Sequence, residues 1–408
     1  MSVVLLAVGS RGDVAPMIAL GRELRRRGAD VTVVALRDHT PAVTGAGLRP
    51  APVDASLADA GVPAAALARG PAAYTREVSR WLAGIAPRVV AAELAAVGPG
   101  DVVVAGLLSV DDADALRRAR GCRVWHALYA PLLPTRYGAS GLAAVRPRGA
   151  SRLNRWAGAA AAAAVAGMCT TTGRALRREL GLPPTSAARF VRLLTTAPTL
   201  LAAGRALVPP APDWPPHVRQ TGAWIEDAPP PPAPGELAAF LGAGPPPLFV
   251  SFGSIAGAER ADVDLVVRAA RRADRRVVFG APVTGADLPP TVHAVRDVSY
   301  RWLFPRTAGV VHHGGAGTVA EALLAGVPSV AVPVGADQPF HGRRLHALGV
   351  GPEPVPRRRL TEERLAALFD DLTGERADRY RASAESIGQQ IRDEPGVRAA
   401  ADAVLATG

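Results

Sequence analysis

The sequence of 408 residues contains no lysine, so all 47 of its basic side chains are arginines. The absence of lysine excludes a Walker A phosphate loop, a Schiff-base enzyme and a pyridoxal-phosphate site, because each needs a lysine amine. Only two cysteines are present, Cys122 and Cys169, which are too few for a disulfide framework or a zinc cluster. We expect them to be buried thiols in a reducing compartment.

Strongly apolar runs are also lacking. A long uncharged run, residues 156–173, is mostly alanine and glycine, which drive membrane insertion weakly. The N-terminus has no basic segment before its apolar run and predicts a first strand rather than a signal peptide. The formal charge is +11, but the arginines are scattered and aromatic residues make up only 5%. We therefore expect a cytoplasmic protein with no stable membrane insertion and no nucleic-acid partner.

Strand and helix patterns alternate along the chain. Ser2–Val8 is a continuous apolar run, residues 17–27 have helical periodicity, and Asp30–Leu36 follows as the next strand. This spacing predicts a parallel, doubly wound sheet. Thirteen prolines between residues 209 and 247 exclude a regular helix or a central strand there. The alternation of strands and helices restarts at Leu248–Phe252.

The predicted fold is therefore α/β, with two Rossmann-like domains of doubly wound parallel sheet that face a cleft. We assign residues 1–208 to the first domain, 209–246 to a proline-rich linker, and 247–385 to the second domain. Ligands of such sheets bind at the carboxyl ends of the strands, which makes the cleft the expected site.

The strongest local motif is Val310-Val-His-His-Gly-Gly-Ala-Gly-Thr318, where a strand ends and a helix begins. Glycines let the backbone approach a ligand, and the helix N-terminus offers free N–H groups and a positive dipole end. His313 and Thr318 can add an imidazole N–H and a hydroxyl. The motif predicts a diphosphate site; the alternative is a tight turn whose residues are small for packing.

Three further motifs are weaker. Asp337 and Gln338 follow the next strand and suit the hydroxyls of a sugar, or else form an ordinary polar loop. Asp13 stands just before a helix and is either its N-cap or a general base. Ser254 ends a turn after a strand and could line a phosphate. No Gly-x-Gly-x-x-Gly follows the first strand, and no Gly-x-Ser-x-Gly is present, which disfavours dinucleotide oxidoreductases and α/β-hydrolases.

Taken together, the motifs resemble those of the bacterial nucleotide-sugar glycosyltransferases of the GT-B fold. The resemblance is to the branch that glycosylates antibiotic aglycones, with sterol glucosyltransferases as relatives. It is carried along nearly the whole chain, in order, by Gly9-Ser-Arg-Gly-Asp-Val-Ala-Pro, Thr221-Gly-Ala-Trp, Phe249-Val-Ser-Phe-Gly-Ser, Leu303-Phe-Pro-Arg, His312-His-Gly-Gly-Ala-Gly-Thr and Gly335-Ala-Asp-Gln-Pro.

The resemblance implies an inverting transfer from a UDP- or dTDP-sugar to a small hydrophobic aglycone, with no metal ion and no cofactor beyond the nucleotide sugar. Asp13 would be the base that deprotonates the acceptor, and residues 386–408 would form a helix that returns to the first, acceptor-binding domain. The donor would be bound in the second domain by Ser254, Val298, His313, Gly315, Ala316, Gly317, Thr318, Asp337 and Gln338.

The sequence contains fewer recognisable motifs for the acceptor site than for the donor site. Ser10 belongs to the opening signature, and the aromatic residues that could line an acceptor pocket are Trp81, Trp125, Tyr129 and Tyr137. These rings could equally be core or surface residues. Ala336 stands where related sequences often have glycine, and Tyr300 where they often have histidine.

The alternatives that stay open are a sterol or lipid glucosyltransferase, a sugar-nucleotide 2-epimerase, and a non-catalytic partner that binds a nucleotide sugar. The chain is expected to be a monomer or a homodimer.

Overall fold

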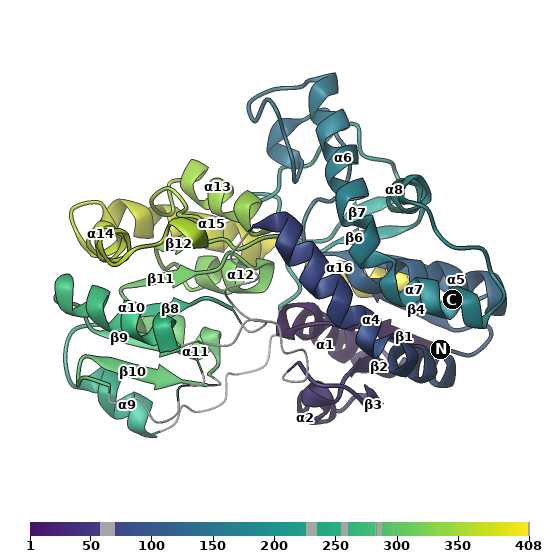
Figure 1. The fold of residues 1–408 in the computed structure, drawn as a ribbon, viewed down its shortest axis with the longest axis horizontal. Coiled ribbons are helices and arrows are strands. Elements are labelled where there is room, and N and C mark those ends of the chain that lie inside the picture. Colours follow the sequence, from purple (N-terminus) through teal and green to yellow (C-terminus); the bar gives the residue numbers. More distant parts are fainter. Residues whose placement is uncertain are drawn as a thin grey trace. The chain divides into compact units, whose positions relative to one another are not determined.

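The computed structural model describes residues 1–57, 70–225, 235–253, 260–281, 283, 288–296 and 298–406. The chain divides into two compact units. The N-terminal unit comprises Met1–Gly61, Thr75–Glu226 and Glu394–Gly408, and the C-terminal unit comprises Val62–Tyr74 and Asp227–Asp393. The predicted α/β architecture with two parallel sheets is confirmed, because each unit contains one such sheet (Figure 1).

The sheet of the N-terminal unit has seven parallel strands in the order β3-β2-β1-β4-β5-β6-β7. Its central strands are uninterrupted apolar runs, as expected of strands covered on both faces. The strands are β1 (Ser2–Leu6), β2 (Asp30–Leu36), β3 (Arg49–Val53), β4 (Val102–Gly106), β5 (Arg123–Leu128), β6 (Thr199–Leu201) and β7 (Val218–Gln220).

Helices connect these strands on both sides of the sheet (Figure 1). They are α1 (Arg11–Arg26), α2 (Thr40–Gly45), α4 (Pro71–Ala96), α5 (Val110–Arg120), α6 (Arg152–Cys169), α7 (Thr171–Glu179), α8 (Ala187–Thr196) and α16 (Val397–Leu405), with short 3₁₀ helices at Arg37–His39, Leu107–Ser109 and Gly138–Ser140. Within the part of the chain that the structure describes, no helix combines the length and the apolar character needed to cross a membrane.

The sheet of the C-terminal unit has five parallel strands in the order β10-β9-β8-β11-β12. They are β8 (Leu248–Ser251), β9 (Val277–Gly280), β10 (Val292–Val295), β11 (Gly309–His312) and β12 (Ser329–Ala331). The helices are α9 (Gly235–Gly242), α10 (Arg260–Arg272), α11 (Tyr300–Leu303), α12 (Ala316–Leu324), α13 (Gln338–Ala347), α14 (Glu362–Thr373) and α15 (Ala377–Asp393), with 3₁₀ helices at Phe304–Arg306 and Arg357–Arg359.

The proline-rich segment contains an element that the sequence did not indicate. Strand β7 lies within it and pairs only with β6, at the edge of the sheet. An edge position is where a proline-rich neighbourhood is tolerated, since the outer N–H groups of the strand need no partner. The change of unit falls at Glu226 and Asp227, inside the segment.

The C-terminal residues belong to both units. Helix α15 packs against α12 of the C-terminal unit, whereas α16 packs against α1 of the N-terminal unit. The guanidinium group of Arg27 ties the two N-terminal-unit helices together through Asp402 and the carbonyl oxygen of Arg398. The change of unit lies between Asp393, the last residue of α15, and Glu394.

Candidate functional site

Ser10 and Asp13 form the turn that follows β1 in the N-terminal unit. Helix α1 begins at Arg11 with Ser10 as its N-cap, so Asp13 lies within the first turn. The expectation that Asp13 precedes the helix as its cap is therefore wrong; Ser10 takes that position. The Asp13 carboxylate accepts hydrogen bonds at Oδ2 from the Ser10 main-chain N–H over 2.8 Å and from its hydroxyl over 2.9 Å.

Gly9 makes the position of the Asp13 carboxylate possible. Its φ angle is +149°, and a Cβ atom added at Gly9 would lie 2.4 Å from Asp13 Oδ2. A side chain at this position would therefore displace the carboxylate. The positive end of the α1 dipole and the two hydrogen bonds stabilise the charged form of Asp13.

Three more side chains lie near this turn. The Tyr129 hydroxyl donates to the main-chain carbonyl oxygen of Asp13 over 3.1 Å. Burial, followed by the charge of Asp13, raises the pKa of Tyr129 and of the fully buried Cys169 thiol. His39 Nε2 lies 3.3 Å from the Gly9 carbonyl oxygen, and burial lowers the pKa of its imidazole.

His39 and Cys169 were not singled out from the sequence. His39 follows β2, the neighbour of β1, and the rule that ligands bind at the carboxyl ends of parallel strands could have found it. Cys169 ends a helix far along the chain and carries no local signal.

The other expected acceptor residues lie elsewhere in the N-terminal unit. Trp125 is 5% exposed within the core, under the guanidinium group of Arg219, which favours its interpretation as a core residue. Trp81 is half-buried on α4, and its indole Nε1 has no partner among the described residues. Tyr137 is half-buried beside a single bridge to Ala150. Of this aromatic set, the structure brings only Tyr129 to Asp13.

The turn after β11 holds His313 between two glycines of the C-terminal unit. A Cβ atom at Gly315 would lie 2.5 Å from His313 Nε2, and one at Gly253 would lie 3.3 Å from Cγ of the same ring. Gly253 follows β8, which pairs with β11, so strand pairing brings two sequence motifs to one imidazole. Burial lowers the pKa of His313 to about 4, so its ring is neutral near pH 7. Its Nδ1 atom is buried without a partner in the described part of the chain.

The first turn of α12 has no side-chain cap, because its N-cap is Gly315. Val319 donates to the Gly315 carbonyl oxygen over 3.0 Å, whereas the N–H groups of Ala316, Gly317 and Thr318 have no acceptor among the described residues. Gly317 is exposed, and a Cβ atom there would meet nothing within 4 Å. Uncapped N–H groups beside open space are the kind of donor set that suits an anion.

The loop after β12 contains Asp337 and Gln338, the first residues at α13. Gln338 Oε1 accepts from the main-chain N–H groups of Val334 over 2.8 Å and Gly335 over 3.2 Å. The Gln338 amide oxygen thus shapes its own loop, while its amide nitrogen makes no hydrogen bond with described residues. Asp337 is the N-cap residue of α13, with its side chain 27% exposed.

The remaining donor-site candidates are placed as follows. Val298 is half-buried and packs against the apolar cluster that contains Phe249 and Phe304. Its side chain is therefore occupied by packing, and a ligand would meet its main chain. Ser254 lies outside the described residues.

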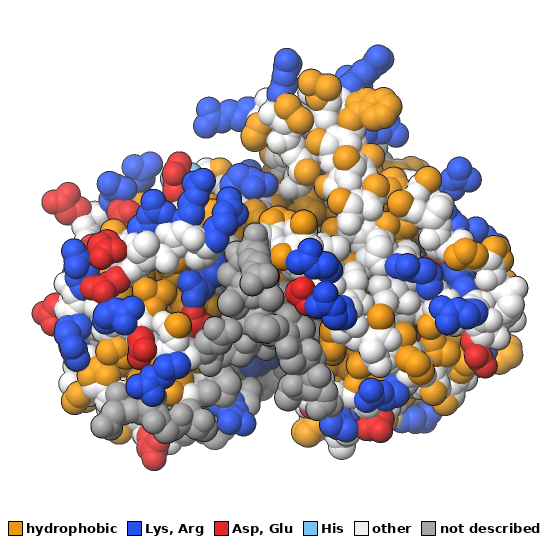
Figure 2. Space-filling view, viewed as in Figure 1, with side chains coloured by type: hydrophobic (Ala, Val, Ile, Leu, Met, Phe, Trp, Pro, Cys, Tyr) orange, Lys and Arg blue, Asp and Glu red, His pale blue; other side chains and the backbone are white. Residues whose placement is uncertain are grey.

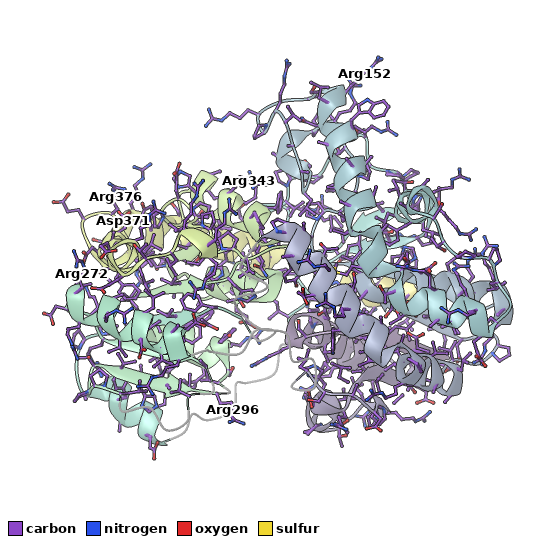
Figure 3. The ribbon with its side chains drawn as sticks, viewed as in Figure 1. Arg152, Arg272, Arg296, Arg343, Asp371 and Arg376 are labelled. Carbon is purple, nitrogen blue, oxygen red and sulfur yellow. The ribbon has the colours of Figure 1, made fainter. Side chains whose placement is uncertain are left out.

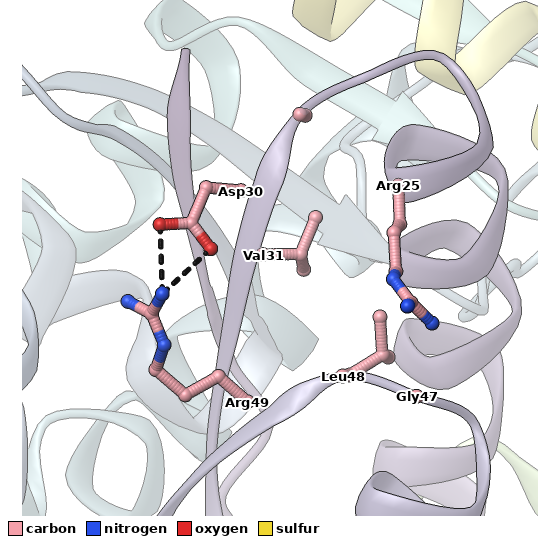
Figure 4. Close-up of a pocket in the computed structure, with 7 residues that line it drawn as sticks. Arg25, Asp30, Val31, Gly47, Leu48 and Arg49 are labelled. Atoms are coloured by element: carbon pink, nitrogen blue, oxygen red, sulfur yellow. Dashed lines mark hydrogen bonds and ion pairs between the residues drawn. The ribbon is translucent and has the colours of Figure 1, made fainter.

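A surface cavity of about 290 Å³ lies far from these turns along the strands of the N-terminal unit (Figure 4). It is bordered by Arg25, Asp30 and Arg49, and both carboxylate oxygens of Asp30 lie 3.0 Å from the Arg49 guanidinium group. Asp30 is the first residue of β2, so the cavity lies at the amino ends of the strands. This edge is opposite to the one where parallel sheets bind ligands.

The arginines do not gather on one element. Figure 2 shows them dispersed over the surfaces of both units, interspersed with acidic and apolar side chains. Those labelled in Figure 3 lie on or beside α6, β10, α10, α13 and α15 (Arg152, Arg296, Arg272, Arg343 and Arg376). Arg376 is paired with Asp371 over 3.2 Å.

Comparisons with known proteins give family matches in both halves of the chain. The glycosyltransferase family 28 N-terminal domain matches residues 3–85, and the C-terminal domain of erythromycin biosynthesis protein CIII-like proteins matches residues 264–405. The O-mycaminosyltylonolide 6-deoxyallosyltransferase of Streptomyces fradiae is 35% identical over 97% of this chain and 95% of its own length.

The names of other relatives state different acceptors. The vancomycin aglycone glucosyltransferase of Amycolatopsis orientalis is 33% identical over 95% of this chain and 94% of its own length. A sterol 3-beta-glucosyltransferase of Arabidopsis thaliana is 36% identical, but over only 48% of this chain and 31% of its own length.

Solved structures share the fold along the whole chain. The kitacinnamycin glycotransferase matches with a TM-score of 0.70 and 21% identity, over 99% of this chain and 98% of its own. The glycosyltransferase VinC, solved in complex with dTDP, matches with a TM-score of 0.62 and 21% identity, over 99% and 98%.

Proposed function

The chain belongs to the nucleotide-sugar-dependent glycosyltransferases of the GT-B fold, and we propose that it glycosylates a small hydrophobic natural product by an inverting, metal-independent reaction. The proposed donor is a UDP- or dTDP-sugar. The observation that carries this proposal is the uncapped first turn of α12, where three N–H groups without an acceptor among the described residues lie beside the half-buried, neutral His313.

The diphosphate is the chemical group that this turn fits. Departure of a nucleoside diphosphate from the anomeric carbon concentrates negative charge on the leaving oxygen. Fixed N–H donors and a helix dipole stabilise that charge without reorganising, and one such donor is worth about 3 kcal/mol in the transition state. Because these groups stabilise the negative charge of the leaving diphosphate, the proposed reaction needs no divalent metal ion.

The rest of the donor is assigned by the positions of the neighbouring motifs. The proposal assigns the sugar hydroxyls to Asp337 and the amide nitrogen of Gln338, and the nucleotide base to the main chain of Val298. Ser254 is assigned to the phosphates from its sequence motif alone. The dTDP complex of VinC and the 6-deoxyallosyl donor named for the Streptomyces relative favour a dTDP-sugar, and the glucosyltransferase relatives favour a UDP-sugar.

Asp13 is the proposed general base. The acceptor hydroxyl transfers its proton to the Asp13 carboxylate as its oxygen forms the new bond to the anomeric carbon. The bond from that carbon to the diphosphate oxygen breaks, and the electron pair leaves with the nucleotide. A single displacement of this kind inverts the anomeric configuration. A positioned base typically contributes about 10²–10⁴-fold in rate.

The acceptor is a hydrophobic aglycone that meets Asp13 from the N-terminal unit. Ser10 and Tyr129 lie at Asp13, and Trp81 and Tyr137 are the half-buried aromatic residues that remain for a wider pocket. A sterol is the second candidate acceptor, because a sterol glucosyltransferase is among the relatives. Turnover with sterols but not with macrolide or glycopeptide aglycones would select it.

The first test is a thermal-unfolding panel with UDP, dTDP, GDP, NAD and ATP in the presence of EDTA. A ligand at 100 times its dissociation constant adds about 2.7 kcal/mol to the stability of the native state. We expect UDP or dTDP to raise the unfolding temperature, and GDP, NAD and ATP to leave it unchanged. The absence of a shift with every diphosphate would contradict the α12 site, and a shift with NAD alone would overturn the donor assignment.

Two further measurements test the reaction. Product formation that is unchanged by EDTA and has the anomeric configuration opposite to that of the donor agrees with the proposal. Conversion of a nucleotide sugar without any acceptor would instead indicate an epimerase.

A further inference from the structure

His341, on α13, connects the two loops that the proposed function assigns to the donor. Its side chain is fully buried. The Nδ1 atom lies 2.9 Å from the carbonyl oxygen of Gly314 in the turn after β11, and 3.5 Å from Asp337 Oδ2 in the loop after β12. One imidazole nitrogen thus faces a residue of each loop.

The chemistry of Gly314 determines the role of the nitrogen that faces it. A carbonyl oxygen can only accept, so Nδ1 of His341 is the hydrogen-bond donor. On the other side of the same residue, the Gly314 N–H donates to His312 Nδ1 over 3.0 Å. Two histidines therefore bind the two main-chain polar groups of one glycine. The second nitrogen of each ring is buried without a partner among the described residues.

Gly314 is also the point where the two loops touch. Its φ angle is +93°, and a Cβ atom there would lie 2.9 Å from the main-chain oxygen of Gln338. This conformation requires glycine. Glycine has no side chain to pack and has the freest backbone of any residue, so its position depends on the contacts of its main chain. The hydrogen bond from His341 therefore links the turn after β11 to α13, the helix whose N-cap is Asp337.

We propose that His341 is a positioning residue that aligns the diphosphate-binding turn with the sugar-binding carboxylate of Asp337. This inference rests on the proposed function. A nucleotide sugar occupies both loops and depends on their alignment, whereas a nucleoside diphosphate occupies only one. Loss of the Nδ1 donor should therefore weaken the binding of the nucleotide sugar more than that of the diphosphate. A misplacement of about 1 Å in such a site can cost about 10²-fold in rate.

The test compares His341→Asn with His341→Leu. An asparagine amide nitrogen is attached at the same point of the side chain as Nδ1 and can donate to Gly314, whereas leucine has no donor. Affinities of UDP, dTDP and the corresponding nucleotide sugars are measured by calorimetry for both variants and the wild type. We expect His341→Leu to lose at least about 10-fold more affinity for the nucleotide sugar than for the diphosphate, and His341→Asn to recover most of that loss.

Equal losses in both variants, or equal losses for both ligands, would show that His341 only fills space. If the leucine variant does not fold, His341→Gln supplies the comparison, because its amide lies one atom further from the main chain. Binding of neither diphosphate nor nucleotide sugar by the wild type would overturn the proposed function itself. Wild-type binding with unchanged variants overturns only the role of His341.

Discussion

The hydroxyl group of Ser10 donates a hydrogen bond to the Asp13 carboxylate over 2.9 Å, and the Ser10 main-chain N–H donates to the same oxygen over 2.8 Å. The proposed base is therefore part of the N-terminal cap of α1. This geometry orients the carboxylate before any acceptor arrives. It also means that a substitution of Asp13 changes the helix terminus as well as the chemistry.

Asp13→Asn separates these two effects. The asparagine side-chain oxygen can still accept from the Ser10 N–H, so the free energy of unfolding should fall by no more than about 1 kcal/mol. The amide cannot take a proton from the acceptor, so kcat should fall by about 10²–10⁴-fold. The measurement is steady-state transfer to the aglycone beside urea denaturation of the same sample.

Ser10→Ala is the matched control for Asp13→Asn. It removes the hydroxyl but keeps the main-chain donor to Asp13, so kcat should change far less than in the asparagine variant. Undiminished transfer by Asp13→Asn would exclude Asp13 as the base. His39, whose Nε2 lies 3.3 Å from the Gly9 carbonyl oxygen at the same turn, would then be the next candidate.

Gly315→Ala should weaken diphosphate binding by displacing His313. The new Cβ atom would lie 2.5 Å from His313 Nε2, which is closer than a non-bonded contact allows. We expect at least about a 10-fold loss of affinity for UDP or dTDP, about 1.4 kcal/mol, measured by calorimetry. Stability should also fall, because the ring has to leave its site between the two glycines.

A double substitution identifies the cause of that loss. In the His313→Ala background the clash is absent, so Gly315→Ala should cost no further stability, and the two changes should be strongly non-additive. Additive costs would show instead that Gly315 matters for its own backbone conformation.

Much of this architecture could be predicted because it follows from local pattern. Residues 30–36 form a strand with the bounds that the sequence indicates. The glycosyltransferase family indicated by the ordered motifs is confirmed by the relatives. Two neighbouring turn motifs, around Gly253 and His313, were found because small residues between a strand and a helix have few other uses.

The parts that could not be predicted depend on packing between distant segments. Helix α1 begins six residues earlier than its apolar periodicity indicates, because Ser10 and not Asp13 is the cap. Short edge strands such as β7 bury little and leave no pattern. Cys169 and His341 reach the two turns only through helix packing, so neither position carries a signal in its own sequence neighbourhood.

Ala336→Gly should stabilise the loop that holds Asp337. Ala336 has a φ of +55°, a left-handed conformation that costs an L-residue about 1–2 kcal/mol. Glycine adopts it freely but adds entropy to the unfolded chain, so we expect a net gain of up to about 1 kcal/mol in urea denaturation. The control Ala347→Gly, at the helical end of α13, should lose stability. A loss in both variants would contradict the strain at Ala336.

Two buried carboxyl groups predict how stability depends on pH. Glu93 of α4 and Asp112 of α5 are both fully buried. Burial, followed by the charge of Asp112, raises the pKa of Glu93 well above its usual range, and burial, followed by the charge of Asp111, raises the pKa of Asp112 to about 7. Each group therefore keeps its proton in the native state at pH values where the unfolded chain has released it.

Since the native state then binds more protons, the free energy of unfolding should fall as the pH rises from about 4 to about 7 through Asp112, by up to about 1.4 kcal/mol per pH unit. Asp112→Asn removes this ionisation while its side-chain oxygen can still accept from Thr172. The variant should therefore gain on the wild type as the pH is raised from 5 to 8 in urea denaturation. The control Asp54→Asn, whose side chain is 82% exposed, should follow the wild-type profile. Parallel profiles for the wild type and Asp112→Asn would contradict the prediction. They would show that Asp112 ionises as readily in the native state as in the unfolded chain.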